Sequence, residues 1–205
     1  MSRGEGVGDV FEDPTSADLA GASNVLVLSP ALADGVREAY YETFLPVDPS
    51  ERTVLAVEYS RSPGQYLAEW ERHRGAVPAR CGIIDVGEPG ATADAGSVDG
   101  AKVARIESPG DLTGIGMKVG DFLASDGGSD TVLTLDSLTV LLQYVELERA
   151  FRFLNAIASQ VRQVGAVAHY HADPNAHDDG ELATIAQLYE GVARYDDGDW
   201  ETKRR

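Results

Sequence analysis

Three of the four histidines lie in one short segment near the C-terminal end of the chain. His169, His171 and Asp173 alternate along the sequence, and His177 follows shortly afterwards. Side chains two residues apart share one face of a β-strand, and imidazole and carboxylate groups are common ligands of divalent metals. These four residues therefore predict a candidate metal site, and with it a metal-dependent hydrolase. Local polar contacts or a subunit contact would explain the same residues without a metal.

A second candidate site begins where the most apolar segment ends. The run from Thr131 to Leu135 is followed by Asp136 and Ser137. A carboxylate and a hydroxyl at the end of a strand can form a residual metal or polar site. They can equally cap the strand and position the next turn, and we favour this second interpretation.

These residues need a scaffold, and the sequence predicts one of alternating strands and helices. We expect strands at 24–28, 52–59, 81–86, 103–106, 131–136, 166–170 and 191–195. We expect helices at 34–44, 62–73, 111–123, 138–145, 147–164 and 181–188. Several strands are apolar without alternation, as buried parallel strands are. The pattern predicts an α/β protein whose mostly parallel, twisted sheet carries helices on both faces.

The length of 205 residues fits a single domain with a sizeable core. We expect residues 23–196 to form this domain. Residues 1–22 read as a disordered acidic tail, residues 197–205 as a charged C-terminal tail, and residues 87–100 as a mobile loop.

The charge of the chain is strongly acidic. There are 34 acidic and 17 basic residues, which gives a net charge of −17, and lysine occurs only at Lys102, Lys118 and Lys203. Such a surface is typical of proteins adapted to high salt, where screening weakens the repulsion between carboxylates. Because a non-specific nucleic-acid binder needs clustered basic residues, we expect no nucleic acid as a partner.

Cysteine content and hydropathy limit the cellular setting. Cys81 is the single cysteine, so no internal disulfide is possible, and we expect a small buried side chain there. No apolar stretch approaches the roughly 20 residues of a membrane helix, and the N-terminal residues lack the apolar core of a signal peptide. We therefore expect a cytoplasmic protein with no membrane span.

Two of these segments resemble motifs of the RecA/KaiC-like ATPases. The segment from Thr131 to Thr139 resembles their Walker B strand, in which apolar residues precede an aspartate and a small hydroxyl residue. The segment from Val57 to Gln65 resembles the part of KaiC that follows the second strand, and Gly191-Val192 resembles the edge strand that ends such domains. The whole chain resembles a family of KaiC-like halophile proteins often labelled transducer-like. The resemblance spans residues 24–195 and implies a three-layer fold in which the strand of His169 and His171 lies beside Asp136.

The phosphate-binding part of that family is missing from this sequence. A P-loop reads Gly-x-x-x-x-Gly-Lys-Ser/Thr, and its backbone N–H groups, lysine and hydroxyl hold the phosphates and Mg²⁺. The matching window, from Ser29 to Arg37, offers no lysine followed by a hydroxyl in any register. Pro30 also lacks an N–H group, and Asp34 would place a negative charge near the phosphates. The resemblance thus implies a degenerate nucleotide site made of Ser29, Asp34, Gly35, Arg37, Asp136 and Ser137.

The family's catalytic glutamate is missing as well. It follows the second strand, where this chain has Ser60 and Arg61, and Glu58 lies two residues too early, within the strand. We therefore expect no catalytic residues, no ATP hydrolysis and no cofactor.

The sequence as a whole favours a non-catalytic regulatory or scaffolding protein in a signalling or cell-organisation pathway. It would act through a protein partner or self-association, since relatives with this fold assemble side by side and the segment from Leu138 to Phe153 is rich in large apolar residues. Two alternatives stay open. One is the metal-dependent hydrolase built on His169, His171 and Asp173, whose pattern partly resembles that of metallo-β-lactamases but has Pro174 in place of the final histidine. The other is a nucleotide-binding protein whose altered loop uses Arg37 to contact phosphate.

Overall fold

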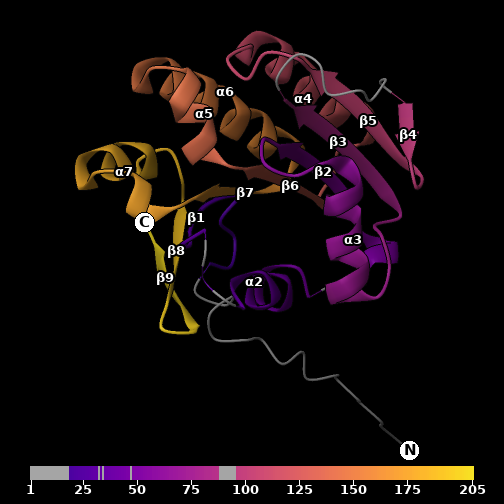
Figure 1. Cartoon of the computed structure of the whole chain (residues 1–205), viewed down its shortest axis with the longest axis horizontal. Helices are drawn as coiled ribbons and strands as arrows, with labels where there is room; N and C mark the ends of the chain where they lie inside the picture. Colours follow the sequence, from indigo (N-terminus) through magenta and orange to yellow (C-terminus); the bar gives the residue numbers. More distant parts are fainter. Residues whose placement is uncertain (1–18, 32, 34, 47, 88–95) are drawn as a thin grey trace, which may run out of the picture.

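A single nine-stranded sheet forms the centre of the molecule (Figure 1). The computed structural model describes residues 19–31, 33, 35–46, 48–87 and 96–205. The order of the strands is β4-β5-β3-β2-β6-β7-β1-β8-β9. Their bounds are β1 Asn24–Leu28, β2 Thr53–Glu58, β3 Arg80–Val86, β4 Gly96–Val98, β5 Ala101–Ile106, β6 Thr131–Asp136, β7 Val167–Ala172, β8 Gly191–Asp196 and β9 Asp199–Arg204.

Neighbouring strands from β5 to β8 run parallel, and the short β4 and the last strand β9 add antiparallel edges. Each crossover between parallel strands needs a connecting segment, and helices supply most of them. The helices are α2 Val36–Phe44, α3 Pro63–Arg74, α4 Leu112–Asp126, α5 Leu138–Tyr144, α6 Leu147–Val164 and α7 Asp179–Ala186.

The helices cover both faces of the sheet, so the predicted α/β class is confirmed. Figure 1 shows α4, α5, α6 and α7 on one side and α2 and α3 on the other. The side chains of each strand alternate between the two resulting cores. On β2, for example, Leu55 and Val57 face the α4–α7 core, whereas Val54 and Ala56 face the α2–α3 core.

Local signals explain why α3 begins and ends where it does. Its N-terminus carries a capping box, in which Ser62 accepts from the backbone N–H of Gln65 and the Gln65 side chain accepts from the backbone N–H of Ser62. Pro63 occupies the first turn, where no N–H donor is needed. Gly75 ends the helix in the left-handed conformation, at φ 75°.

Two ends of the domain differ from the sequence prediction. Residues 197–205 were expected to be a charged tail, but β9 pairs with β8 there. Trp200 drives this pairing, because its ring is buried against Phe44 and Tyr195. At the other end, Leu19 and Ala22 belong to the core, while the rest of the predicted acidic tail, residues 1–18, lies outside the described residues. In the predicted mobile loop, 96–98 form β4 and 88–95 are outside the described residues.

The described helices include none that is both long and apolar enough to cross a membrane.

Candidate functional site

A row of polar side chains crosses the carboxyl edge of the sheet. Asp85, Glu58, Asp136 and His171 lie directly opposite one another on β3, β2, β6 and β7. The predicted adjacency of the histidine strand and Asp136 is thereby confirmed. All four side chains project to the side covered by α2 and α3. Same-face residues of β3, β2 and β6 belong to that core, and on β7 the residues on either side of His171, Tyr170 and Ala172, face the opposite core. This edge is where open α/β sheets bind their ligands.

Arg61 lies over this row and contacts three carboxylates. Its Nε and Nη2 donate to the two oxygens of Glu58, at 2.9 and 2.7 Å. Nη2 also donates to Asp136 at 3.0 Å, and Nη1 donates to Glu69 of α3. The side chain of Glu58 is fully buried, and that of Arg61 is 12% exposed. The guanidinium therefore occupies the space between the ends of β2, β6 and α3.

Arg37, in the first turn of α2, completes what we call the Arg61 cluster, made of Arg37, Glu58, Arg61, Glu69 and Asp136. Its Nη1 donates to Asp136 at 2.9 Å, and its Nε lies 3.8 Å from Glu69. At 40% exposure its side chain is the most accessible of the five. Two arginines and three carboxyl groups thus meet in a largely buried space, where unpaired charges would be costly.

The pKa values of Glu58 and Asp136 are shifted in opposite directions. Burial raises the pKa of Glu58 to about 8, although the charge of Arg61 opposes this shift. Burial would also raise the pKa of Asp136, but the charges of His171, Arg37 and Arg61 lower it to about 2. At neutral pH Asp136 is therefore ionised, and the two arginines are its counter-charges.

The two strand histidines are buried in their neutral form. Burial lowers the pKa of His169 to about 3, and that of His171 to about 4 even though Asp136 favours the charged ring. Nδ1 of His169 is hydrogen-bonded to the Tyr40 hydroxyl at 2.8 Å. His171 is 7% exposed and packs edge-on against the Tyr40 ring. Within the described part of the chain its imidazole has no hydrogen-bond partner.

Asp173 and His177 form hydrogen bonds with residues outside β7 and not with the two strand histidines. One oxygen of Asp173 accepts from the N–H of Ala31, at 3.0 Å, and the other caps the short turn at Asn175. His177 lies between Thr139 and Glu181, at 2.9 and 3.0 Å. Across the described residues, no three His, Cys, Asp or Glu side chains form a group that could hold a metal ion. The four residues of the predicted metal site are therefore not brought together.

The loop after β1 uses its backbone N–H groups internally. Ser29 donates to the carbonyl of Ala172 at 3.1 Å, Ala31 donates to Asp173, and Ala33 donates to the carbonyl of Pro30 at 3.2 Å. Pro30 has no N–H to offer. A phosphate cradle needs several N–H groups aimed at one point. The N–H groups of Ser29, Ala31 and Ala33 are therefore not available for one.

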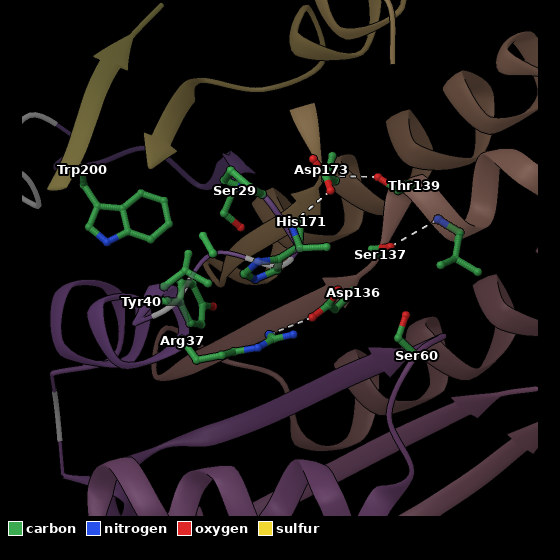
Figure 2. A pocket seen from close by; sticks show the side chains of 16 residues that line it. Ser29, Arg37, Tyr40, Ser60, Asp136, Ser137, Thr139, His171, Asp173 and Trp200 are labelled. Carbon is green, nitrogen blue, oxygen red and sulfur yellow. Dashed lines mark hydrogen bonds and ion pairs between the residues drawn. The ribbon is translucent and has the colours of Figure 1, made fainter. Parts of the chain in front are cut away.

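A pocket of about 370 Å³ opens between this loop and the ends of β6 and β7. Figure 2 shows the Arg37 side chain reaching across it to Asp136, with Tyr40 and His171 beside it. Trp200 of β9 lines the far side. The wall thus combines an arginine, a neutral histidine and two aromatic rings.

Residues 22–194 match a family model described as "Family of unknown function (DUF7504)". The chain belongs to this family. A search of the curated proteins finds no match for it. A solved structure described as "Structural study of Project ID PH0250 from Pyrococcus horikoshii OT3" has a similar fold. The matched region covers 89% of this chain and 86% of that chain. The TM-score is 0.58 and the sequence identity 14%, so the likeness shows the fold alone.

Most residues of the predicted nucleotide site in this DUF7504 chain lie around the pocket. Ser29, Arg37, Asp136 and Ser137 line it. Ser137 also acts as the N-cap of α5, since its hydroxyl accepts from the N–H of Val140 at 3.2 Å. Gly35 is the N-cap of α2, at φ 74°, a conformation that favours glycine. Asp34 is outside the described residues.

Sequence reasoning missed three contributors to the site in this DUF7504 chain. Arg61 was considered only as a replacement for a glutamate, and its contacts with three carboxylates were not foreseen. Tyr40 lies within the predicted helix at 34–44, which did not by itself place it at a site, and Trp200 lies in the segment predicted as a charged tail. The one available signal was the run of charged residues Glu58, Arg61 and Glu69 around the start of α3.

Proposed function

We propose that this DUF7504 chain is a non-catalytic regulatory or scaffolding domain of the RecA/KaiC-like kind, acting in the cytoplasm through contacts with other proteins. The observation that carries the proposal is the position of Arg61. Phosphoryl transfer in such folds needs a carboxylate to hold Mg²⁺ and a free glutamate or comparable group to orient water. Here Asp136 and Glu58 are both bound by Arg61, at 3.0 and 2.7 Å.

The energetic cost of freeing those carboxylates supports the same conclusion. Displacing Arg61 would leave a buried guanidinium and buried carboxylates without partners, which costs about 3–5 kcal/mol. A metal ion would have to recover that cost before binding at all. The neighbouring loop offers little compensation, because the N–H groups of Ser29, Ala31 and Ala33 are already hydrogen-bonded.

ATP binding and turnover test the proposal directly. The full chain, in molar KCl with MgCl₂, would be titrated with ATP in a calorimeter and assayed for released phosphate. We expect no turnover above the rate of a heat-denatured sample. Turnover that disappears in an Asp136→Asn variant would overturn the proposal, because it would show that Asp136 still supports the chemistry.

A second candidate, a nucleotide-binding protein without hydrolysis, is favoured by one observation. Arg37 is 40% exposed and lines the pocket, with one guanidinium nitrogen on Asp136. ATP binding without turnover, weakened in an Arg37→Ala variant, would support this candidate over a purely scaffolding role.

A further inference from the structure

The cations of the described chain divide into those that form an ion pair and those that do not, and three of the latter lie close together. Arginines and lysines with carboxylate partners occur throughout the fold, as at Arg61, Arg105 and Arg162. Acidic residues outnumber basic ones two to one, so a place where cations outnumber carboxylates differs from the rest of the chain. Within the described part of the chain, Arg194, Lys203 and Arg205 are exposed and have no ion pair.

These three cations line one groove at the C-terminal edge of the sheet. The groove has a volume of about 520 Å³ and lies between α7, β8 and β9. Its apolar surface comes from Ala183, Ala186 and Val192. We call it the C-terminal groove. Figure 1 shows α7 beside β8 and β9 at the end of the sheet opposite β4.

The local charge of the groove is opposite to that of the chain. Arg194, Lys203 and Arg205 contribute three positive charges, and Glu201 contributes one negative charge, while the whole chain carries −17. Arg194 lies opposite Glu201, and Val192 lies opposite Lys203, so the charged and apolar side chains share one face of the β8–β9 hairpin. An apolar floor with cationic walls fits a ligand that has both apolar and acidic groups.

We propose that the C-terminal groove binds an acidic peptide segment of a partner protein, with carboxylates on Arg194, Lys203 and Arg205 and small apolar side chains on Val192, Ala183 and Ala186. The inference rests on the proposed scaffolding role, which it deepens by naming a contact surface and the chemistry of its partner. A nucleic acid fits less well, because the negative charge of the whole chain repels a polyanion and the floor is apolar. An acidic peptide brings fewer charges and supplies apolar contacts.

Peptide binding tests this inference with a matched pair of variants. A fluorescein-labelled peptide of alternating Glu and Val would be titrated with the full chain, and its anisotropy followed in 0.5 M and 2 M KCl. One triple variant carries Arg194→Glu, Lys203→Glu and Arg205→Glu. The control carries Arg72→Glu, Lys118→Glu and Arg149→Glu. These are exposed cations on α3, α4 and α6 that have no ion pair with any described residue. Both variants change the net charge equally.

We expect the groove variant to lose about tenfold or more in affinity, and the control to change by about twofold or less, because reversing a charge at a contact costs far more than reversing a remote one. Binding should also weaken from 0.5 M to 2 M KCl and be lost with a Gln-Val peptide. Equal losses in the two variants would overturn the proposal, as would equal binding of the Gln-Val peptide. Circular dichroism and thermal unfolding of both variants confirm that each remains folded.

Other occupants would give different results, and each would overturn the proposal. A labelled oligonucleotide that binds as well as the peptide, and is lost in the groove variant, would identify a general anion surface. Self-association measured by light scattering, abolished by the groove variant alone, would identify a second copy as the occupant. Peptide binding that appears only after deletion of residues 1–17 would identify the chain's own acidic N-terminal sequence. ATP turnover would refute the proposed non-catalytic role without affecting any of these readouts.

Discussion

The arginines of the Arg61 cluster are paired and largely buried, whereas the cations of the C-terminal groove are exposed to solvent. In the Arg61 cluster, two arginines meet three carboxylates in a space that is largely closed to water. In the C-terminal groove, Arg194, Lys203 and Arg205 face solvent and have no ion pair within the described chain. One region uses its positive charge internally, and the other presents it outward.

The difference shows what burial demands of a charged side chain. A buried ion must be matched, because the loss of hydration costs several kcal/mol. An exposed cation keeps its water and can remain unmatched. The Arg61 cluster is therefore a structural element that closes the sheet edge, whereas the groove keeps its charges available for a partner. The following predictions test this contrast, from the largest expected effect to the smallest.

Removal of Arg61 should have the largest effect. The variant Arg61→Ala leaves Glu58, Glu69 and Asp136 close together without their shared cation, and Asp136 keeps only Arg37. We expect the free energy of unfolding to fall by about 3–5 kcal/mol, measured by urea denaturation at constant KCl.

A matched control for Arg61 is Arg152→Ala, which removes an exposed pair with Glu148. Such pairs contribute about 0.5 kcal/mol or less. Added guanidinium at low concentration should restore part of the stability of Arg61→Ala and none of that of Arg152→Ala. Equal losses in the two variants would show that Arg61 is not a buried counter-charge.

The buried histidines should make the fold sensitive to acid. The pKa values of His169 and His171 fall from 6.5 in the unfolded chain to about 3 and about 4 in the fold. Their contribution to stability is complete above pH 6.5 and is lost as the pH falls toward 4, because the unfolded chain then binds protons that the fold excludes. Each histidine contributes a slope of about 1.4 kcal/mol per pH unit in this range.

Glu58 acts in the opposite direction, since its raised pKa of about 8 disfavours the fold as the pH rises above 4.5. The histidine effect is therefore measured as a difference between proteins. Between pH 6 and 4.5, the stability of His171→Gln should fall less steeply than that of the native chain, by about 1.4 kcal/mol per unit. Parallel pH profiles would show that His171 is not buried as a neutral ring.

Removal of Arg37 should lower the free energy of unfolding by an intermediate amount, because Arg37 belongs to the cluster but its side chain is 40% exposed. Its removal in Arg37→Ala leaves Asp136 bound to Arg61. We expect a loss of about 1 kcal/mol, smaller at high KCl than at low KCl, in urea denaturation. A loss as large as that of Arg61→Ala would mean that the two arginines share the role of counter-charge equally.

The groove cations should have the smallest effect on stability. The variants Arg194→Ala, Lys203→Ala and Arg205→Ala each remove a side chain that has no ion pair among the residues the structure describes. Each should therefore change the free energy of unfolding by about 0.5 kcal/mol or less. A larger loss in any of them would reveal a structural contact and weaken the contrast with the Arg61 cluster.

Much of the fold was predictable because its signals are local. The apolar runs at 131–136 and 24–28 and the capping box at Ser62 and Gln65 identify strands and a helix start within a few residues of sequence. β9 was missed for the opposite reason. The segment reads as a charged tail, and only the burial of Trp200 against Phe44 and Tyr195, which come from elsewhere in the chain, makes it a strand. The RecA/KaiC-like assignment stays a prediction.

The sequence by itself determined the α/β class, the acidic charge and the absence of a Gly-x-x-x-x-Gly-Lys-Ser/Thr motif, because each depends on residue identity or on short-range order. Only the tertiary structure decided that Arg61 fills the site. Its carboxylate partners come from β2, α3 and β6, and Asp136 is 75 residues away. It likewise separated the four residues of the predicted metal site. His169, Asp173 and His177 are hydrogen-bonded to Tyr40, Ala31 and Thr139, and His171 has no hydrogen-bond partner among the described residues. Which charges meet depends on how distant strands pair, and that pairing is set by the packing of the whole sheet.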